Sequence, residues 1–100
     1  MSQRTEMLIT GRLVKAFLDA GYNLGVNDGE DTTVKDCADY KTIIGAMCTT
    51  DHDYLLVYDN GKKIGWVMLV WGNDTDVISD LTVNLTHIVD PVSDWVESRF

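Results

Sequence analysis

Residues 54–83 read YLLVYDNGKKIGWVMLVWGNDTDVISDLTV, and this stretch decides the expected fold class. Alternating apolar runs are separated by turn residues at Asn60-Gly61 and at 72–75, which predicts three consecutive antiparallel strands. Asn-Gly is the strongest short hairpin signal, because both central residues of a type I′ turn need a positive φ. We therefore expect the sheet to be built around this antiparallel meander.

The two-residue turn also sets an expected register. It places Tyr58 opposite Lys63, Val57 opposite Ile64, Leu55 opposite Trp66 and, after the second turn, Val70 opposite Val77. Side chains alternate between the two faces of a strand. The face expected under the helices carries Leu55, Val57, Ile64, Trp66, Met68, Val70, Ser79 and Leu81. The other face carries Tyr54, Leu56, Tyr58, Val67, Leu69, Trp71, Asp76, Ile78 and Asp80.

The segments on either side supply the remaining elements. Helical spacing of apolar residues predicts a first helix from about Thr5 to Ala20, with Thr5 or Thr10 as N-cap and Gly21 as its stop. Residues 22–34 predict a hairpin with an Asn27-Asp28-Gly29 loop, Gly29 being left-handed. This register puts Tyr22, Leu24, Val26 and Val34 on one face.

Two further helices follow. Asp39 is the expected cap of a short helix whose buried stripe is Tyr40, Ile43, Ile44 and Met47. The last segment keeps helical spacing, but Pro91 would lose a hydrogen bond and clash with the preceding turn. We expect a helical turn at 84–89, a break or kink with Asp90 as N-cap, and a helix at 91–99.

These elements give the order α-β-β-α-β-β-β-α. We expect a single α+β domain over residues 1–100, with an antiparallel sheet of about five strands and the helices packed on one face.

Charge and composition limit the possible functions. The 100 residues carry a net charge of −8, and residues 64–98 contain no Lys or Arg. Such a surface repels nucleic acid and anionic membrane and attracts a basic protein. No 18-residue apolar run and no secretory signal is present, so we expect a cytoplasmic protein with no membrane span. Cys37 and Cys48 are too few for a disulfide framework and are expected to be reduced, half-buried thiols.

The sequence shows no motif typical of catalysis or of binding a cofactor or metal ion. The glycines do not have the spacing of a phosphate loop, and the aspartates lack the calcium-loop pattern. His52 and His87 have no partner at zinc-ligand spacing. We expect His52 to be a loop histidine held by Asp51 and Asp53, and His87 to lie on the wet side of its helix. We therefore expect this protein not to be an enzyme and to bind no cofactor.

The segments AFLDAGYNLGVNDGE (16–30) and YLLVYDNGKKIGWVMLVWGND…DVISD (54–80) resemble small acidic proteins of proteobacterial and bacteriophage genomes. The resemblance covers nearly the whole chain and brings no catalytic residues. It implies a genomic setting in which small acidic proteins inhibit restriction or CRISPR systems, some of them by imitating nucleic acid.

Two functions follow as hypotheses. The first is a phage-type inhibitor of a host nucleic-acid-handling complex, which binds a basic partner protein through an acidic surface of Asp28, Glu30, Asp31, Asp74, Asp76, Asp80, Asp90, Asp94 and Glu97. Alternate carboxylates on one strand are about 6.7 Å apart, against one charge per about 1.7 Å of duplex DNA. One strand is therefore too sparse, and the acidic groups have to combine on one side.

The second hypothesis is a homodimeric assembly or scaffold module. It would associate through an aromatic sheet face of Tyr54, Tyr58, Leu69, Trp71 and Ile78. A charge-driven complex weakens as salt rises, whereas a contact between apolar surfaces does not.

Overall fold

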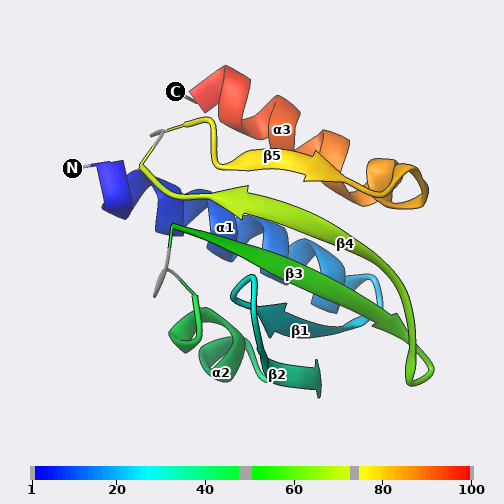
Figure 1. The fold of residues 1–100 in the computed structure, drawn as a ribbon. Helices are drawn as coiled ribbons and strands as arrows, with labels where there is room; N and C mark the ends of the chain where they lie inside the picture. The colour runs from blue at the N-terminus through cyan, green and yellow to red at the C-terminus, as the bar shows by residue number, and fades with distance from the viewer. Residues whose placement is uncertain (1, 48–50, 73–74, 100) are drawn as a thin grey trace.

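The structure, a computed structural model, describes residues 2–47, 51–72 and 75–99. The elements in chain order are α1 (Ser2–Asp19), β1 (Asn23–Asn27), β2 (Thr32–Cys37), α2 (Tyr40–Gly45), β3 (His52–Asp59), β4 (Lys62–Val70), β5 (Ile78–Leu81), the 3₁₀ turn η1 (Val83–Leu85) and α3 (Thr86–Arg99). One antiparallel sheet has the strand order β2-β1-β3-β4-β5. α1 crosses behind it and contacts both α2 and α3 (Figure 1). The expected α+β class and element order are confirmed.

Local signals explain where α1 ends and where α2 begins. Gly21 adopts φ 94°, and α1 closes with bonds from Gly21 N to Leu18 O (3.0 Å) and from Tyr22 N to Phe17 O (3.1 Å). This is the glycine stop that the sequence predicts. α1 begins at Ser2, so neither proposed threonine is its N-cap. Asp39 caps α2 as expected, because its carboxylate accepts from Thr42 N at 3.2 Å.

The central turn is as expected, but the register beyond it is not. Asn60 and Gly61 have φ values of 53° and 80°, as a type I′ turn requires, and Tyr58 pairs with Lys63. The next pair is Val57 with Gly65, so Ile64 is an extra residue, a β-bulge. A one-residue slip moves every later side chain to the opposite face.

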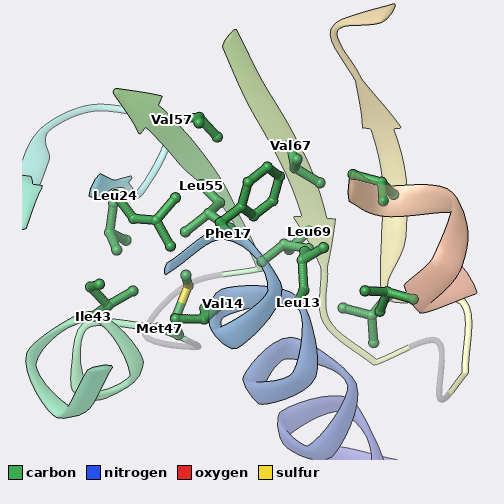
Figure 2. Close-up of a cluster of buried hydrophobic side chains, with 14 of the residues drawn as sticks. Leu13, Val14, Phe17, Leu24, Ile43, Met47, Leu55, Val57, Val67 and Leu69 are labelled. Carbon is green, nitrogen blue, oxygen red and sulfur yellow. The ribbon is translucent and has the colours of Figure 1, made fainter. Parts of the chain in front are cut away.

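The bulge corrects the predicted faces of β4. The pairs are Leu56 with Trp66 and Leu55 with Val67, not Leu55 with Trp66. The buried, helix-covered side of the meander is therefore Leu55, Val57, Val67 and Leu69, as Figure 2 shows. The pair of Leu69 with Ile78 follows the expected β4–β5 register, and the bulge moves both residues to the helix side, where the sequence predicted the opposite face. Val70 N bonds to Val77 O at 2.8 Å, which confirms the expected pairing of these two residues.

The β1–β2 hairpin has a longer loop than predicted. Asn27 pairs with Thr32, so the loop is 28–31 and not 27–29. Gly29 has φ 102°, in the left-handed region as expected. Val26 pairs with Val34, so these two residues share a face as the sequence predicts.

Pro91 neither breaks nor begins the last helix, contrary to prediction. α3 runs from Thr86 to Arg99 with Pro91 inside it, so Asp90 is not its N-cap. Pro91 costs one backbone hydrogen bond. The apolar stripe packs against the core on both sides of it, since Val89 and Val92 are buried. This continuous burial holds the helix together through the proline.

The core lies between the sheet and the helical layer. Phe17 of α1 is fully buried and lies among side chains of β3 and β4 (Figure 2). The fully buried large apolar residues are Phe17, Ile9, Leu13, Leu24, Ile43, Leu55, Leu69, Leu85, Val14, Val26 and Val57. Cys37 is a half-buried free thiol, as expected. Cys48 lies outside the described residues.

Both outer strands of the sheet are irregular. β2 is shifted twice against β1, and its Asp36 has φ 47°, which is unusual for a non-glycine residue. β5 has four residues and pairs irregularly with β4 around Ser79.

Candidate protein-binding site

Three loops meet at one end of the sheet. Asn27 at the end of β1 pairs with Tyr54 of β3, His52 pairs with Val70 at the end of β4, and Leu69 pairs with Ile78 at the start of β5. The β1–β2 loop, the residue before β3 and the β4–β5 loop therefore lie together, on the left in Figure 1. The C-terminal part of α3 ends at the same side of the molecule (Figure 1). We call the carboxylates there the acidic end: Asp28, Glu30, Asp31, Asp51, Asp76 and Glu97.

The β1–β2 loop is shaped by its own carboxylate. Asp28 Oδ1 accepts from Asp31 N at 2.8 Å and from Glu30 N at 3.0 Å, while Asn27 Oδ1 accepts from Gly29 N at 2.8 Å. The backbone bonds from Asp31 and Glu30 lower the pKa of Asp28 below its ordinary value of 3.8. The loop therefore presents a fixed negative charge, with Glu30 and Asp31 exposed beside it.

This loop borders a hollow of about 310 Å³. Its lining residues are Asp28, Gly29, Glu30, Asp51 and His52. A Cβ on Gly29 would lie 2.9 Å from His52 Nε2, so the loop backbone lies close against the imidazole. His52 begins β3 and is not the loop residue that the sequence predicted.

A second hollow of about 240 Å³ opens between the β4–β5 loop and α3. Asp76 from the loop and Glu97 from the helix both line it, together with Thr75, Ile78 and Ser93. Asp76 and Glu97 are exposed. The structure thus brings carboxylates from three separate parts of the chain to one end, as the acidic-surface hypothesis requires.

The remaining residues of the predicted acidic surface either continue from Glu97 along α3 or lie away from the acidic end. Asp90, Asp94 and Glu97 are exposed on α3 at spacings of four and three, so they form one stripe along it. Helix rise puts Asp90 about 10 Å from Glu97 along the axis, away from the acidic end. Asp80 is exposed and lies opposite Met68, toward the far end of β5. Asp74 lies outside the described residues.

Two carboxylates behind the acidic end are buried. Glu6 is 1% exposed and accepts from Gly72 N at 2.7 Å, which ties α1 to the end of β4. Asp53 is fully buried and accepts from Trp71 Nε1 at 2.8 Å. The buried Asp53 lies on the opposite side of β3 from His52, so it does not flank the imidazole as the sequence suggested. Sequence reasoning missed the structural role of both acids.

The predicted aromatic face is only partly present. Tyr54 and Tyr58 lie on the sheet face away from the helices, whereas Leu69 is fully buried on the helix side. Ile78 is beside Leu69, and Trp71 is held by Asp53, so neither belongs to the uncovered face. The bulge replaces them with residues that the sequence placed in the core. We call the side of the meander turned away from the helices the open face: Tyr54, Leu56, Tyr58, Trp66, Met68 and Val70. Leu56 and Tyr58 are buried on this side, and the other four residues are half-buried.

A ladder of rings crosses the open face. His52 packs edge-on against Tyr54 with centroids 5.5 Å apart, and Tyr54 packs edge-on against Trp66 at 5.7 Å. Tyr58 is 6% exposed, and this burial, followed by the charge of Asp36, raises its pKa above the ordinary 10.0. The isolated Gly65 within β4 was the signal that could have revealed the bulge, and with it this face.

No family model, curated protein or solved structure matches this chain. Within the described ranges, no helix is long and apolar enough to cross a membrane. The same part of the chain holds no group of three or more Asp, Glu, His or Cys side chains arranged to bind a metal ion.

Proposed function

We propose that this chain is a non-enzymatic protein-binding module that acts in the bacterial cytoplasm as a phage-type inhibitor of a nucleic-acid-handling defence complex. In this proposal the acidic end occupies a basic partner surface that otherwise holds phosphates. The observation that carries it is the convergence of Asp28–Asp31, Asp76 and Glu97 at one end of the sheet.

Electrostatics supports a partner with a basic surface. The described loops of the acidic end, 28–31, 51 and 75–77, contain no Lys or Arg, and the whole chain carries −8. Carboxylates grouped in this way raise the local negative potential and increase the rate of encounter with a cationic surface.

The test compares two matched charge-reversal variants of tagged protein. One carries Glu30→Lys, Asp31→Lys, Asp76→Lys and Glu97→Lys, and the other carries Asp19→Lys, Asp59→Lys, Asp80→Lys and Asp90→Lys. All eight residues are exposed, and both variants change the net charge equally. The assay is capture of nucleases, polymerases or CRISPR components from a bacterial lysate, with parallel washes at about 0.1 M and 1 M salt.

We expect the wild type and the second variant to retain a partner at low salt only, and the first variant to lose it. Screening at 1 M shortens the Debye length to about 3 Å, which removes a charge-driven contact. Equal loss in both variants would mean that only overall charge matters. Retention by both, at both salt concentrations, would exclude the acidic end as the binding surface.

A second candidate function is a homodimeric assembly module that pairs through the open face. The observation that favours it is the ring ladder of His52, Tyr54 and Trp66 on the side of the sheet opposite the helices. We expect sedimentation to reveal a salt-insensitive dimer that Trp66→Glu with Met68→Glu abolishes. Val83→Glu is the control, because Val83 is 87% exposed. A monomer at millimolar concentration would rule this candidate out.

A further inference from the structure

The outer surface of the helical layer contains a groove that neither proposed function uses. It lies over α1, between α2 and α3, and has a volume of about 480 Å³. We call it the helical groove, and its lining residues are Met7, Leu8, Gly11, Arg12, Lys15, Tyr40, Ile44 and Trp95. The groove combines apolar side chains with two cations in a protein whose net charge is −8.

The floor of the groove depends on Gly11. A Cβ at this position would overlap the hydroxyl of Tyr40, so the missing side chain lets the Tyr40 side chain of α2 lie against α1. A glycine inside a helix costs about 1 kcal/mol relative to alanine. The close approach of Tyr40 gives the residue a structural reason, since any side chain here would have to displace the tyrosine hydroxyl.

Aromatic rings hold the two cations at the walls. The Arg12 guanidinium lies 4.6 Å from the centre of the Trp95 ring, and Lys15 Nζ lies 5.5 Å from the centre of the Tyr40 ring. Both distances fall within the range of cation–π attraction. Arg12 and Lys15 are exposed, and no carboxylate of the described residues forms an ion pair with either of them.

The apolar and cationic parts of the groove follow each other along α1. Leu8, Gly11, Arg12 and Lys15 are spaced at i, i+3, i+4 and i+7, so they form one stripe of about 10 Å. Leu8 at the first end is 52% exposed, an unusual exposure for a leucine in this chain. The stripe therefore begins with an uncovered apolar side chain and ends, two turns later, with two positive charges.

We propose that the helical groove binds an acidic amphipathic helix of a partner protein. An apolar anchor of that helix would contact Leu8 and Ile44, and its carboxylates would lie against Arg12 and Lys15. Helices commonly bind in apolar grooves through anchors at i, i+3, i+4 and i+7, the same spacing that this stripe offers. Charge complementarity with the two cations selects an acidic helix over a basic one.

The negative charge of the whole protein does not cancel this preference. At 0.15 M ionic strength the Debye length is about 8 Å, so exposed charges farther than this from the groove are largely screened there. Arg12 and Lys15 would lie within contact distance of a bound carboxylate. Their attraction therefore dominates over the long-range repulsion.

The probes for the test are two fluorescein-labelled synthetic helices with the same leucine stripe, one flanked by Glu and the other by Lys. Fluorescence anisotropy at 0.15 M salt measures their affinities. The test variant is Arg12→Glu with Lys15→Glu. The control is Lys62→Glu with Lys63→Glu, which makes the same change in net charge at exposed positions of the β3–β4 turn region.

We expect the Glu helix to bind at least tenfold more tightly than the Lys helix. The test variant loses at least tenfold in affinity for the Glu helix and prefers the Lys helix, while the control stays within twofold of wild type. Leu8→Glu also loses at least tenfold. Should the reversal unfold the protein, Arg12→Gln with Lys15→Gln is expected to remove the preference between the two helices.

Several results would overturn the proposal. These are the absence of saturable binding, equal affinity for the two helices, or equal effects of the test and control variants. Dimerisation of the free protein that Leu8→Glu abolishes would instead assign the groove to a second copy of this chain. None of these results affects the acidic end, so the two proposals fail independently.

Discussion

Replacing Gly65 with alanine tests how η1 docks on the bulged strand β4. A Cβ at Gly65 would overlap Thr82 Oγ1 and would lie 3.0 Å from Leu85 Cδ1 and 3.2 Å from Asn84 Oδ1. Thr82 Oγ1 accepts from Trp66 N at 3.2 Å, and Thr82 N donates to Trp66 O at 3.1 Å. The new methyl group would displace the threonine hydroxyl and break this reciprocal contact.

The expected cost has three parts. Leaving Trp66 N–H without its acceptor costs about 1–3 kcal/mol, and overpacking against Leu85 costs about 1–3 kcal/mol. Replacing glycine with alanine also lowers the conformational entropy of the unfolded chain, which stabilises the folded state by about 0.4–1 kcal/mol. Together these terms predict a net loss of about 1–6 kcal/mol in the free energy of unfolding. In a domain of this size, each 1 kcal/mol lowers Tm by roughly 4–8 °C.

Urea denaturation followed by tryptophan fluorescence measures this loss, and a double-mutant cycle with Thr82→Ala identifies its cause. Thr82→Ala removes the atom that the methyl group would strike. The double variant should therefore be about 1–2 kcal/mol more stable than the sum of the single changes. Strict additivity, or a Gly65→Ala variant as stable as wild type, would refute the docking geometry.

Three further predictions concern the core, the buried acid and pH. Phe17→Ala should cost about 3–5 kcal/mol in a chemical denaturation experiment, because it empties the centre of the core. Glu6→Ala should cost about 1–3 kcal/mol, and Glu6→Gln less, since its amide oxygen can still accept from Gly72 N; equal losses would contradict this bond. The pKa of Asp39 is lowered by bonds from the Thr42 side chain and backbone, and that of Asp28 by its loop. Their contribution is present above the ordinary 3.8 and is lost as pH falls through the lowered folded values. Thermal melts between pH 5 and 2 should therefore decline less steeply for Asp28→Asn with Asp39→Asn than for wild type.

The sequence predicted those features that single residues determine locally. The Asn60-Gly61 turn, the Gly21 stop and the Asp39 cap each depend on backbone geometry within a few residues. The prediction of a helix start at Pro91 was wrong because it depended on local preference alone. That preference was outweighed by burial on both sides, in Val89 and Val92, which only the tertiary packing reveals.

The faces of β4 were not decided by its pattern, because the strand is apolar on both sides. Two registers that differ by one residue then have similar hydrophobic burial. The choice depends on the bulge at Ile64 and on Gly65, whose bare Cα admits Leu85 and Thr82. Gly65 indicated an irregular strand, but its effect on the faces required the position of η1.

The grouping of carboxylates at the acidic end could not be predicted from the sequence. In a five-stranded meander in chain order, the β1–β2 and β4–β5 loops would emerge at opposite ends of the sheet. Asp28 and Asp76 share an end here because β1 pairs with β3, which gives the order β2-β1-β3-β4-β5. The position of Glu97 depends on how α3 packs over the sheet, and no strand pairing determines it. The separation of Asp80 and Asp90 from this end likewise follows from element directions and not from the charge pattern.

The irregular outer strands limit the ways in which this protein can associate. A regular edge strand offers a row of free N–H and C=O groups to which another chain can add, the usual start of fibril growth. Here one edge is interrupted by the left-handed Asp36 and two register shifts, and the other has four residues and carries Asp80. Strand addition is therefore disfavoured at both edges. Association is left to the surfaces of the sheet and of the helices.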